Sequence, residues 1–297
     1  MKLNQLEILC KIIESGSFSR AAGSLHLSQP TLTEHIKSLE DYLGVTLLDR
    51  LGREVVPTKA GEILYEYAQK ILNLKAEAEQ KLYSLRGELK GELVVGASTI
   101  PGEYILPALI KDFRDNFPTI FIKLSVGDTK KVIEETLNNQ IELGIVGPEV
   151  KSAKLEYYPF IKDELILVVP PLSSWKKVKS ITLEKLKEVP FVLREEGSGT
   201  RMVMEKTLEN YGIGVSDLEV VATLGSTMAL VQAIKRGVGG SIISYRAVKE
   251  DLKKGALKRI PIEKVKFYRK FYLVLRRGKT RSPLCEAFKS FLLDTSK

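Results

Sequence analysis

From residue 91 to the end of the chain, short apolar runs alternate with amphipathic segments of helical spacing, and this pattern restricts the fold more than any other feature. Strands are expected at 92–98, 119–126, 141–147, 164–170, 190–193, 218–224, 240–245 and 266–277. Helices are expected at 104–117, 130–139, 200–212, 226–237 and 283–294. Repeated strand–helix units predict parallel sheets with helices on both faces, so this region belongs to the α/β class.

Four hydroxyl-rich turns occur where an expected strand ends and a helix begins. They are "ASTIPGE" (97–103), "GDTKK" (127–131), "REEGSGTR" (194–201) and "GSTMA" (225–229). The third is not a dinucleotide-binding fingerprint, because Met202 stands where a third glycine is needed. Since the carboxyl ends of parallel strands share one edge of a sheet, we expect the four turns to converge.

The N-terminal region has a different pattern, with three short helices followed by an extended pair of segments. Helices are expected over 3–13, 18–25 and 29–42, and the extended pair over 45–58. Ser28 suits the N-cap of the third helix, Pro30 its first turn, and Gly44 its end. This is the layout of a winged helix-turn-helix, in which the start of the third helix reaches base edges in the major groove.

One long amphipathic segment, 58–86, follows the wing. A helix of this length spans roughly 40 Å. An apolar stripe, interrupted by one lysine, runs along it through Leu64, Tyr67, Ile71, Leu74, Ala78, Lys81 and Leu85. We expect no partner for this stripe within the chain, so the helix should pair with a second copy of itself.

The net charge of +9 does not come from the N-terminal region, where residues 1–90 hold 12 basic and 12 acidic residues. Residues 251–281 hold 12 basic and 2 acidic residues. This basic segment has two interpretations. It forms a solvated surface, which we favour, or it contacts flanking DNA or an acidic partner such as RNA polymerase.

Cysteine and histidine usage argues against several classes of protein. Cys10 and Cys285 lie near opposite ends of the chain, which indicates no disulfide framework and a reducing cytoplasm. No apolar run is long enough to span a membrane. The two histidines, His26 and His35, both precede residue 91, so we expect no metal site and no Ser–His–Asp enzyme in the α/β region. His26 is interpreted as turn structure, and His35 as a capping or phosphate-facing group.

The chain resembles the LysR-type transcriptional regulators along its full length. The resemblance rests on "SFSRAAGSLHLSQPTLTEHIKSLEDYLGVTLLDR" (17–50), on "PTKAGEILY" (57–65) and on an α/β domain of the expected size. Leu48 stands where the family usually has Phe, an apolar exchange that affects packing only. "GASTIPGEYILP" (96–107) with "REEGSGTR" resembles the regulators associated with carbon fixation, sulfur metabolism and selenium metabolism.

The resemblance implies a multidomain α/β protein in three parts. Residues 1–58 are the winged helix-turn-helix, 59–88 the linker and dimerisation helix, and 89–297 a two-lobed effector domain like that of periplasmic binding proteins. Lobe I is expected over about 89–162 and 266–297, and lobe II over about 163–265. The chain should leave lobe I near 161–166 and return near 263–267. The implied assembly is a homodimer or homotetramer on a dyad operator in double-stranded DNA.

The resemblance also places the DNA contacts. A glutamine pairs bidentately with adenine, and threonine donates to phosphate or touches a thymine methyl group. Glu34 is ambiguous, since a carboxylate either accepts from cytosine or repels phosphate. The expected DNA-binding residues are Ser28, Gln29, Pro30, Thr31, Thr33, His35, Lys37, Arg50 and Arg53.

In the two-lobed domain, the converging turns are expected to bind a small anion as co-inducer, with no other cofactor. Glycines admit close approach of backbone N–H groups, hydroxyls donate, and a helix N-terminus is positive. The expected effector-binding residues are Ser98, Thr99, Thr129, Ser198, Gly199, Thr200, Arg201 and Thr227. Arg201 pairs with the anion or with Glu195 or Glu196. The alternatives are a solute-binding transport protein, or an enzyme that uses the same cleft.

Overall fold

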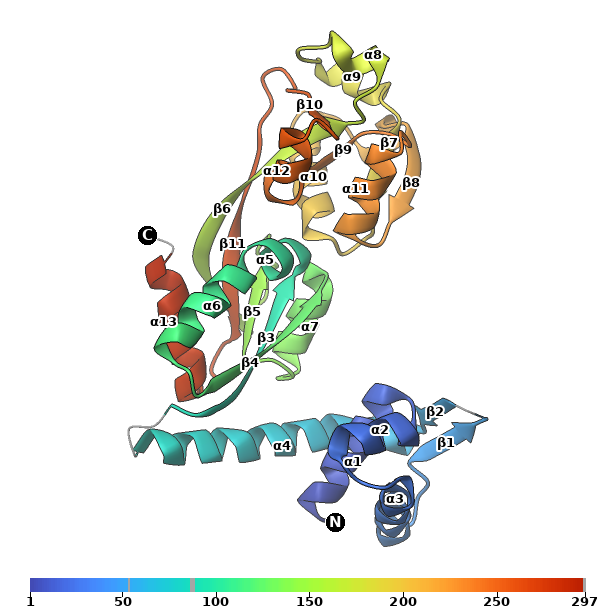
Figure 1. Ribbon diagram of the computed structural model, residues 1–297, viewed down its shortest axis with the longest axis vertical. Helices are drawn as coiled ribbons and strands as arrows, with labels where there is room; N and C mark the ends of the chain where they lie inside the picture. The colour runs from blue at the N-terminus through green and yellow to red at the C-terminus, as the bar shows by residue number, and fades with distance from the viewer. Residues whose placement is uncertain (53, 86–88, 296–297) are drawn as a thin grey trace. The chain divides into compact units, whose positions relative to one another are not determined.

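The computed structural model of the protein describes residues 1–52, 54–85 and 89–295 (Figure 1). The chain divides into two compact units, Met1–Gly87 and Glu88–Lys297. In the described part of the chain, no helix is both long and apolar enough to cross a membrane.

The first unit contains the predicted three helices and wing. Its elements are α1 (Leu3–Ser15), α2 (Phe18–Leu25), α3 (Gln29–Leu43), β1 (Leu48–Leu51), β2 (Glu54–Pro57) and α4 (Lys59–Leu85). The signals read from the sequence set the ends of α3. The Ser28 hydroxyl accepts from the backbone N–H of Thr31, Pro30 lies in the first turn, and Gly44 adopts a φ of 69° as the C-cap. Leu32, Ile36 and Leu39 then bury one face of α3 in a core shared with α1 and α2.

The expectation that α4 has no partner within the chain was wrong for its N-terminal half. Leu6 and Cys10 of α1 are buried with Ala68 of α4, and Leu64 and Ile71 pack against them. Burial raises the pKa of the Cys10 thiol to about 12, with the Glu14 carboxylate as the next contributor.

Other apolar side chains of α4 project into solvent. Leu74 and Leu82 have 66% and 64% of their surface exposed, and Ile63 and Tyr67 are also exposed. The side chains of Lys81 and Leu85 lie outside those that the structure describes. The exposed residues occur at helical spacing and form a stripe that nothing within the described unit covers.

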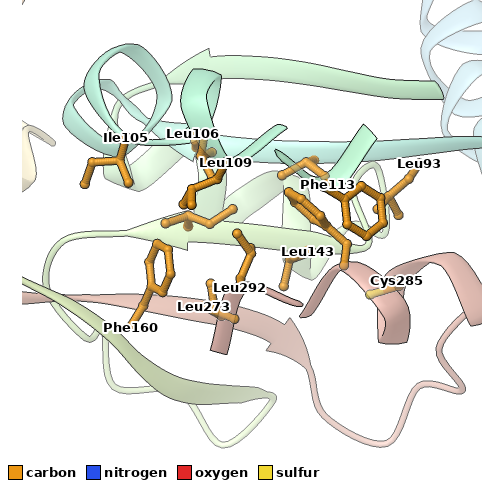
Figure 2. Close-up of a cluster of buried hydrophobic side chains, with 14 of the residues drawn as sticks. Leu93, Ile105, Leu106, Leu109, Phe113, Leu143, Phe160, Leu273, Cys285 and Leu292 are labelled. Carbon is orange, nitrogen blue, oxygen red and sulfur yellow. The ribbon is translucent and has the colours of Figure 1, made fainter. Parts of the chain in front are cut away.

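Lobe I of the second unit is built on a parallel core. Strand β3 (Gly91–Ser98) pairs in parallel with β4 (Ile120–Gly127) and β5 (Leu143–Val146). Its helices are α5 (Thr99–Tyr104), α6 (Leu106–Asn116), α7 (Thr129–Leu137) and α13 (Pro283–Thr295). Figure 2 shows the packing of the aromatic ring of Phe113 among leucines of the strands and helices, with the buried thiol of Cys285 nearby. The helix predicted at 104–117 is interrupted at Ile105, where Pro107 lacks the N–H that a continuous helix needs.

Two long strands connect the lobes, and they correct the prediction of purely parallel sheets. Strand β6 (Leu155–Val169) and strand β11 (Phe267–Arg276) pair in antiparallel fashion and run between the lobes in Figure 1. Their register places Asp163 opposite Arg269, and it shifts between Lys270 and Tyr272. Strand β11 also pairs with β5, so one mixed sheet continues from lobe I into lobe II.

Lobe II contains β7 (Phe191–Arg194) and β8 (Val220–Leu224) as a parallel pair, and β9 (Ser241–Ser244) and β10 (Lys258–Arg259) beside β6. The helices anticipated from the sequence are α10 (Gly199–Glu209) and α11 (Thr227–Lys235). Three further helices were missed, namely α8 (Ser173–Lys176), α9 (Leu183–Lys187) and α12 (Tyr245–Lys253). Helix α12 is rich in charge and presents only Val248 as a fully buried residue, which explains its weak signal.

Candidate effector cavity and DNA-binding surface

Three of the four hydroxyl-rich turns meet between the lobes around a small cavity. The turn after β3 and the turn after β4 come from lobe I, the turn after β7 comes from lobe II, and β11 completes the wall. The cavity measures about 10 Å³, which is room for about one water molecule. Its lining residues are Ser98, Thr99, Ile100, Asp128, Thr129, Arg194, Ser198, Gly199, Thr200 and Arg269.

The lobes approach each other closely where α10 begins. A Cβ atom at Gly199 would lie 2.6 Å from the hydroxyl of Thr129 and 2.7 Å from Pro148 of lobe I, so only glycine fits this contact. The Thr129 hydroxyl is buried and has no hydrogen-bond partner among the residues that the structure describes. An unpaired buried hydroxyl is costly, and a bound ligand or water would satisfy it.

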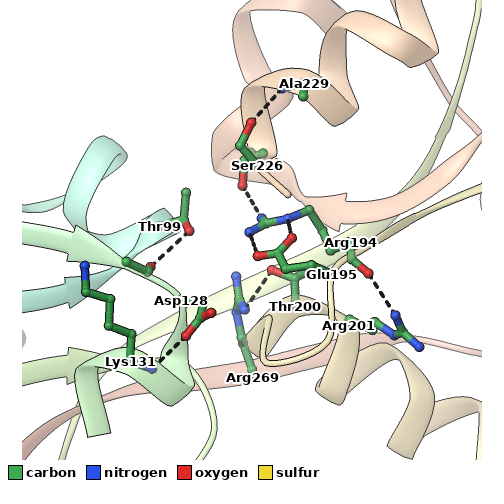
Figure 3. A network of polar contacts seen from close by, with 12 residues as sticks. Thr99, Asp128, Lys131, Arg194, Glu195, Thr200, Arg201, Ser226, Ala229 and Arg269 are labelled. Atoms are coloured by element: carbon green, nitrogen blue, oxygen red, sulfur yellow. Dashed lines mark hydrogen bonds and ion pairs between the residues drawn. The ribbon is translucent and has the colours of Figure 1, made fainter. Parts of the chain in front are cut away.

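Arg269 brings a buried positive charge to the cavity. Its Nε donates to Asp163 Oδ2 at 2.9 Å, and its Nη2 lies 2.8 Å from the same oxygen. Figure 3 shows the third contact, in which Nη1 donates to the Thr200 hydroxyl at 3.1 Å. Burial lowers the pKa of Arg269, and the Asp163 carboxylate opposes that shift. Asp163 in turn accepts from the hydroxyl of Ser244 at 2.8 Å. The guanidinium is therefore held between a lobe II helix and the strands that join the lobes.

Arg194 supplies a second buried guanidinium. Its Nε and Nη2 donate to the carboxylate of Glu195 at 2.7 and 2.6 Å, and its Nη1 donates to the Thr227 hydroxyl at 2.6 Å. The positive charge of Arg194 repels that of Arg269 and lowers the pKa of Arg269. Two guanidinium groups beside one small cavity favour the binding of an anion, although each guanidinium already contacts one carboxylate.

Helix α10 points its N-terminal end at the same cavity. The described residues supply no side-chain cap to this helix, since Ser198 precedes it without a capping hydrogen bond. The first backbone N–H groups of a helix have no acceptor inside it, and the helix dipole makes this end positive. The hydroxyls, the guanidinium groups and the uncapped helix end together form a set of donors suited to a small anion.

The start of α3 presents exposed polar side chains on the surface of the first unit. Gln29 and Lys37 are exposed, and the Gln29 side-chain oxygen accepts from the Ser19 hydroxyl at 3.0 Å. This hydrogen bond aligns the amide while its nitrogen stays free to donate. The two threonines are tied to their own helix, since the Thr31 and Ser28 hydroxyls are 2.7 Å apart and the Thr33 hydroxyl donates to the Gln29 carbonyl at 3.1 Å.

The wing lies beside this surface. Arg50 of β1 stacks its guanidinium over the Phe18 ring, 4.4 Å from the centroid, so its charge is held near the helices. Arg53 lies outside the described residues. His35 is in the middle of α3 and does not cap it, contrary to one expectation, and its carbonyl accepts from Gln5. His26 ends α2 in the left-handed conformation, as expected for a turn residue.

Two family models match the chain and together span almost all of it. Residues 3–62 match "Bacterial regulatory helix-turn-helix protein, lysR family", and residues 86–297 match "LysR substrate binding domain". The chain belongs to the LysR family of transcriptional regulators. A relative from Cyanidium caldarium, named a probable RuBisCO transcriptional regulator, is 35% identical over 289 residues, which cover 96% of this chain and 91% of the relative.

Solved structures of LysR regulators share this fold. Full-length CbnR, solved in complex with its target DNA, covers 100% of both chains with a TM-score of 0.73 at 24% identity. The regulatory domain of CcmR from Synechocystis PCC6803, solved in complex with 2-PG, covers 70% of this chain and 98% of that domain. Its TM-score is 0.64 and its identity 25%.

In this LysR regulator, six of the eight residues expected to bind the effector line the cavity, and two do not. Arg201 points away, where its Nε donates to Glu205 at 2.6 Å and its Nη1 to the Arg194 carbonyl at 3.2 Å. It pairs with neither Glu195 nor Glu196. Thr227 contacts Arg194 and lies behind it, so the fourth turn supports the cavity without lining it.

Sequence reasoning missed the two arginines that do line it. Arg269 belongs to the basic segment that was interpreted as a solvated surface, and that interpretation was wrong for this residue. A signal was present, because Arg269 lies in phase with the apolar residues Phe267, Phe271 and Leu273 on the buried face of β11. In residues 1–52, 54–85 and 89–295, no group of three or more His, Cys, Asp or Glu side chains is arranged to hold a metal ion.

Proposed function

We propose that this LysR regulator binds a small anion in the cavity between its lobes, and that binding alters its interaction with operator DNA. The convergence of two buried guanidinium groups, Arg194 and Arg269, with the uncapped end of α10 carries this proposal. The complex of CcmR with 2-PG supports it, since a regulatory domain of this fold and 25% identity accommodates a small molecule.

Paired carboxylates partly neutralise the guanidinium charges, so attraction at long range is modest. The binding energy then comes from short hydrogen bonds, each worth about 1.5–3 kcal/mol to a charged group. Thr129, Thr200 and the first N–H groups of α10 are the donors in place. Because the cavity has room for about one water molecule, an anion larger than water must widen it. Widening moves one lobe against the other, which is the change we propose for signalling.

The replacement Thr200→Val tests the cavity with nearly the same side-chain volume. We expect at least a tenfold loss of affinity for the anion that the parent protein binds, because one donor and the hydroxyl that anchors Arg269 are removed. The measurement is calorimetric titration of the full-length protein with phosphate, sulfate and 2-PG. Thr223→Val, at an exposed position of β8, is the matched control. Unchanged affinity in Thr200→Val, or binding of neutral and cationic compounds alone, would refute the proposal.

For DNA, we propose that Gln29 reads a base edge while Lys37 and Arg50 contact the phosphate backbone. Gln29→Ala should lower affinity for the operator by about 1–3 kcal/mol and leave non-specific binding almost unchanged. Lys37→Ala should weaken binding to all sequences and reduce the salt dependence. Mobility shifts at several salt concentrations, on DNA upstream of the protein's own gene and on a scrambled duplex, measure both effects. An unchanged ratio of the two affinities in Gln29→Ala would contradict this placement of α3.

The assembly is proposed to be a dimer through the exposed stripe of α4, with pairs of dimers on two neighbouring dyads. The exposed Leu74 and Leu82 support this assembly. The name of the Cyanidium caldarium relative supports a place for the target genes in carbon fixation. A DNA partner supports a cytoplasmic location, and we include contact with RNA polymerase in the proposal.

A further inference from the structure

We propose a second ligand site, for a small polyanion with two or more phosphate charges, in a groove that is separate from the central cavity. The groove measures about 810 Å³, within the range of about 300–1,000 Å³ that small-molecule sites occupy. Residues Lys151, Lys162, Lys206, Lys270, Tyr268 and Tyr272 line it.

 

This groove, at about 810 Å³, is much larger than the central cavity, which measures about 10 Å³. The groove lies between the segment after β5 in lobe I and α10 in lobe II, over the outer face of β11. Tyr268, Lys270 and Tyr272 alternate along β11 with the buried Arg269 and Phe271, so they project from the opposite face of the strand. Arg269 borders both sites, although its charge is paired with Asp163.

The charges in the groove are unbalanced. Lys162 of β6 and Lys270 of β11 are direct cross-strand partners, and like charges in that position destabilise a sheet. Within the described ranges, the amino groups of Lys151, Lys162, Lys206 and Lys270 have no ion-pair partner, and Glu149 is the one carboxylate among the lining residues. A bound polyanion would relieve this repulsion.

The walls of the groove explain why a lysine cluster here differs from an ordinary solvated surface. Lys151 belongs to lobe I, Lys206 to lobe II, and Lys162 and Lys270 to the strands that join the lobes. Ammonium groups act as point charges for phosphate oxygens, and charges spread over several walls suit a ligand with more than one phosphate. A polyanion bound here would hold the two lobes together. The groove therefore differs from the central cavity both in its volume and in the charge of the ligand that it would accept.

The test uses inorganic pyrophosphate as the probe and the full-length protein. Lys162→Gln with Lys270→Gln should weaken calorimetric pyrophosphate binding at least tenfold, because both amino groups of the cross-strand pair are removed. Lys249→Gln with Lys254→Gln, two exposed lysines in α12 and at its C-cap, is the matched control and should bind as the parent does. Thr200→Val should also bind pyrophosphate normally, which separates this site from the central cavity. Parental binding in the Lys162/Lys270 variant would overturn the proposal, as would loss of pyrophosphate binding in Thr200→Val.

A second variant guards against misfolding of the first. Lys270→Glu places opposite charges across the strands, so its melting temperature without ligand should rise by about 1–2 °C while pyrophosphate binding is lost. The fluorescence of Trp175, the single tryptophan of the chain, reports the melting of the second unit. Pyrophosphate should raise the melting temperature of the parent and leave that of Lys270→Glu unchanged. An equal rise in both proteins would show that the groove is not the site.

Discussion

A full-length protein carrying Leu74→Glu and Leu82→Glu is expected to sediment as a monomer and to lose operator binding by roughly 10²–10⁴-fold. Ile63, Tyr67, Leu74 and Leu82 form one exposed stripe along α4, and a second copy of the helix is the partner we propose for it. Two carboxylates in such an interface would have to be buried without partners, which prevents pairing. The half-sites of the operator would then be bound separately, and their affinities would no longer combine.

Because both leucines are exposed in the unit itself, the double replacement should leave its fold intact, and circular dichroism checks the helix content. Ala76→Glu is the matched control, since Ala76 is exposed on α4 but lies away from the stripe. That variant should remain a dimer in sedimentation velocity runs. A dimer that survives the Leu74 and Leu82 replacements would show that another surface holds the two copies together.

The first unit could be predicted almost completely from the sequence, because its signals are local. Ser28, Pro30 and Gly44 fix the ends of α3 through hydrogen bonds and backbone angles that depend only on neighbouring residues. The partner of α4 was missed for the opposite reason. Its apolar stripe is visible in the sequence, but periodicity does not reveal which surface covers it, and Leu6 and Cys10 of α1 cover part of it.

The antiparallel crossing of the lobes was also beyond local reasoning. The first half of β6 carries Tyr157, Tyr158 and Pro159 and lacks a strand-like apolar pattern. It becomes a strand because β11, more than a hundred residues later in the chain, pairs with it. Strand direction is a property of such distant pairings, so the repeated strand–helix pattern predicted the class but not the mixed sheet.

The candidate site was predicted in part, and its charges were not. Turns that end strands are recognised by composition, so Ser98, Thr129 and Thr200 could be placed near one another from the sequence. Arg201 was chosen because it adjoins the turn, yet it lies one helical turn before Glu205 and pairs with it. The excess of basic residues over 251–281 suggested a solvated surface for Arg269, whereas the alternation of buried and exposed residues along β11 indicates that Arg269 is buried.

That burial makes Arg269→Met the replacement with the largest expected effect on stability. It leaves the Asp163 carboxylate, whose side chain is 1% exposed, with Arg246 as its remaining positive partner, whose Nε is 3.6 Å away and whose side chain is 39% exposed. Breaking a buried pair in this way costs about 3–5 kcal/mol, because the remaining carboxylate is not solvated and the more distant, exposed Arg246 neutralises it only in part. Denaturant unfolding followed by Trp175 fluorescence measures the loss in the second unit. Removing both charges, with Asp163→Asn and Arg269→Met, should recover part of it, since no ion is then left in the interior.

Arg259→Met provides the comparison that separates burial from charge. Arg259 of β10 pairs with Glu164 of β6, the residue after Asp163, but both side chains are substantially exposed, so this loss should stay below about 1 kcal/mol. If Arg269→Met were as mild as Arg259→Met, then solvent would reach Asp163 and the guanidinium would not be held in the interior. In that case Arg269 would be free to move between the central cavity and the lysine-lined groove, and the two sites would compete for one charge. A large loss of stability in Arg269→Met alone, with partial recovery in the double variant, would instead show that the Asp163–Arg269 pair is a fixed ion pair of the strands that join the lobes.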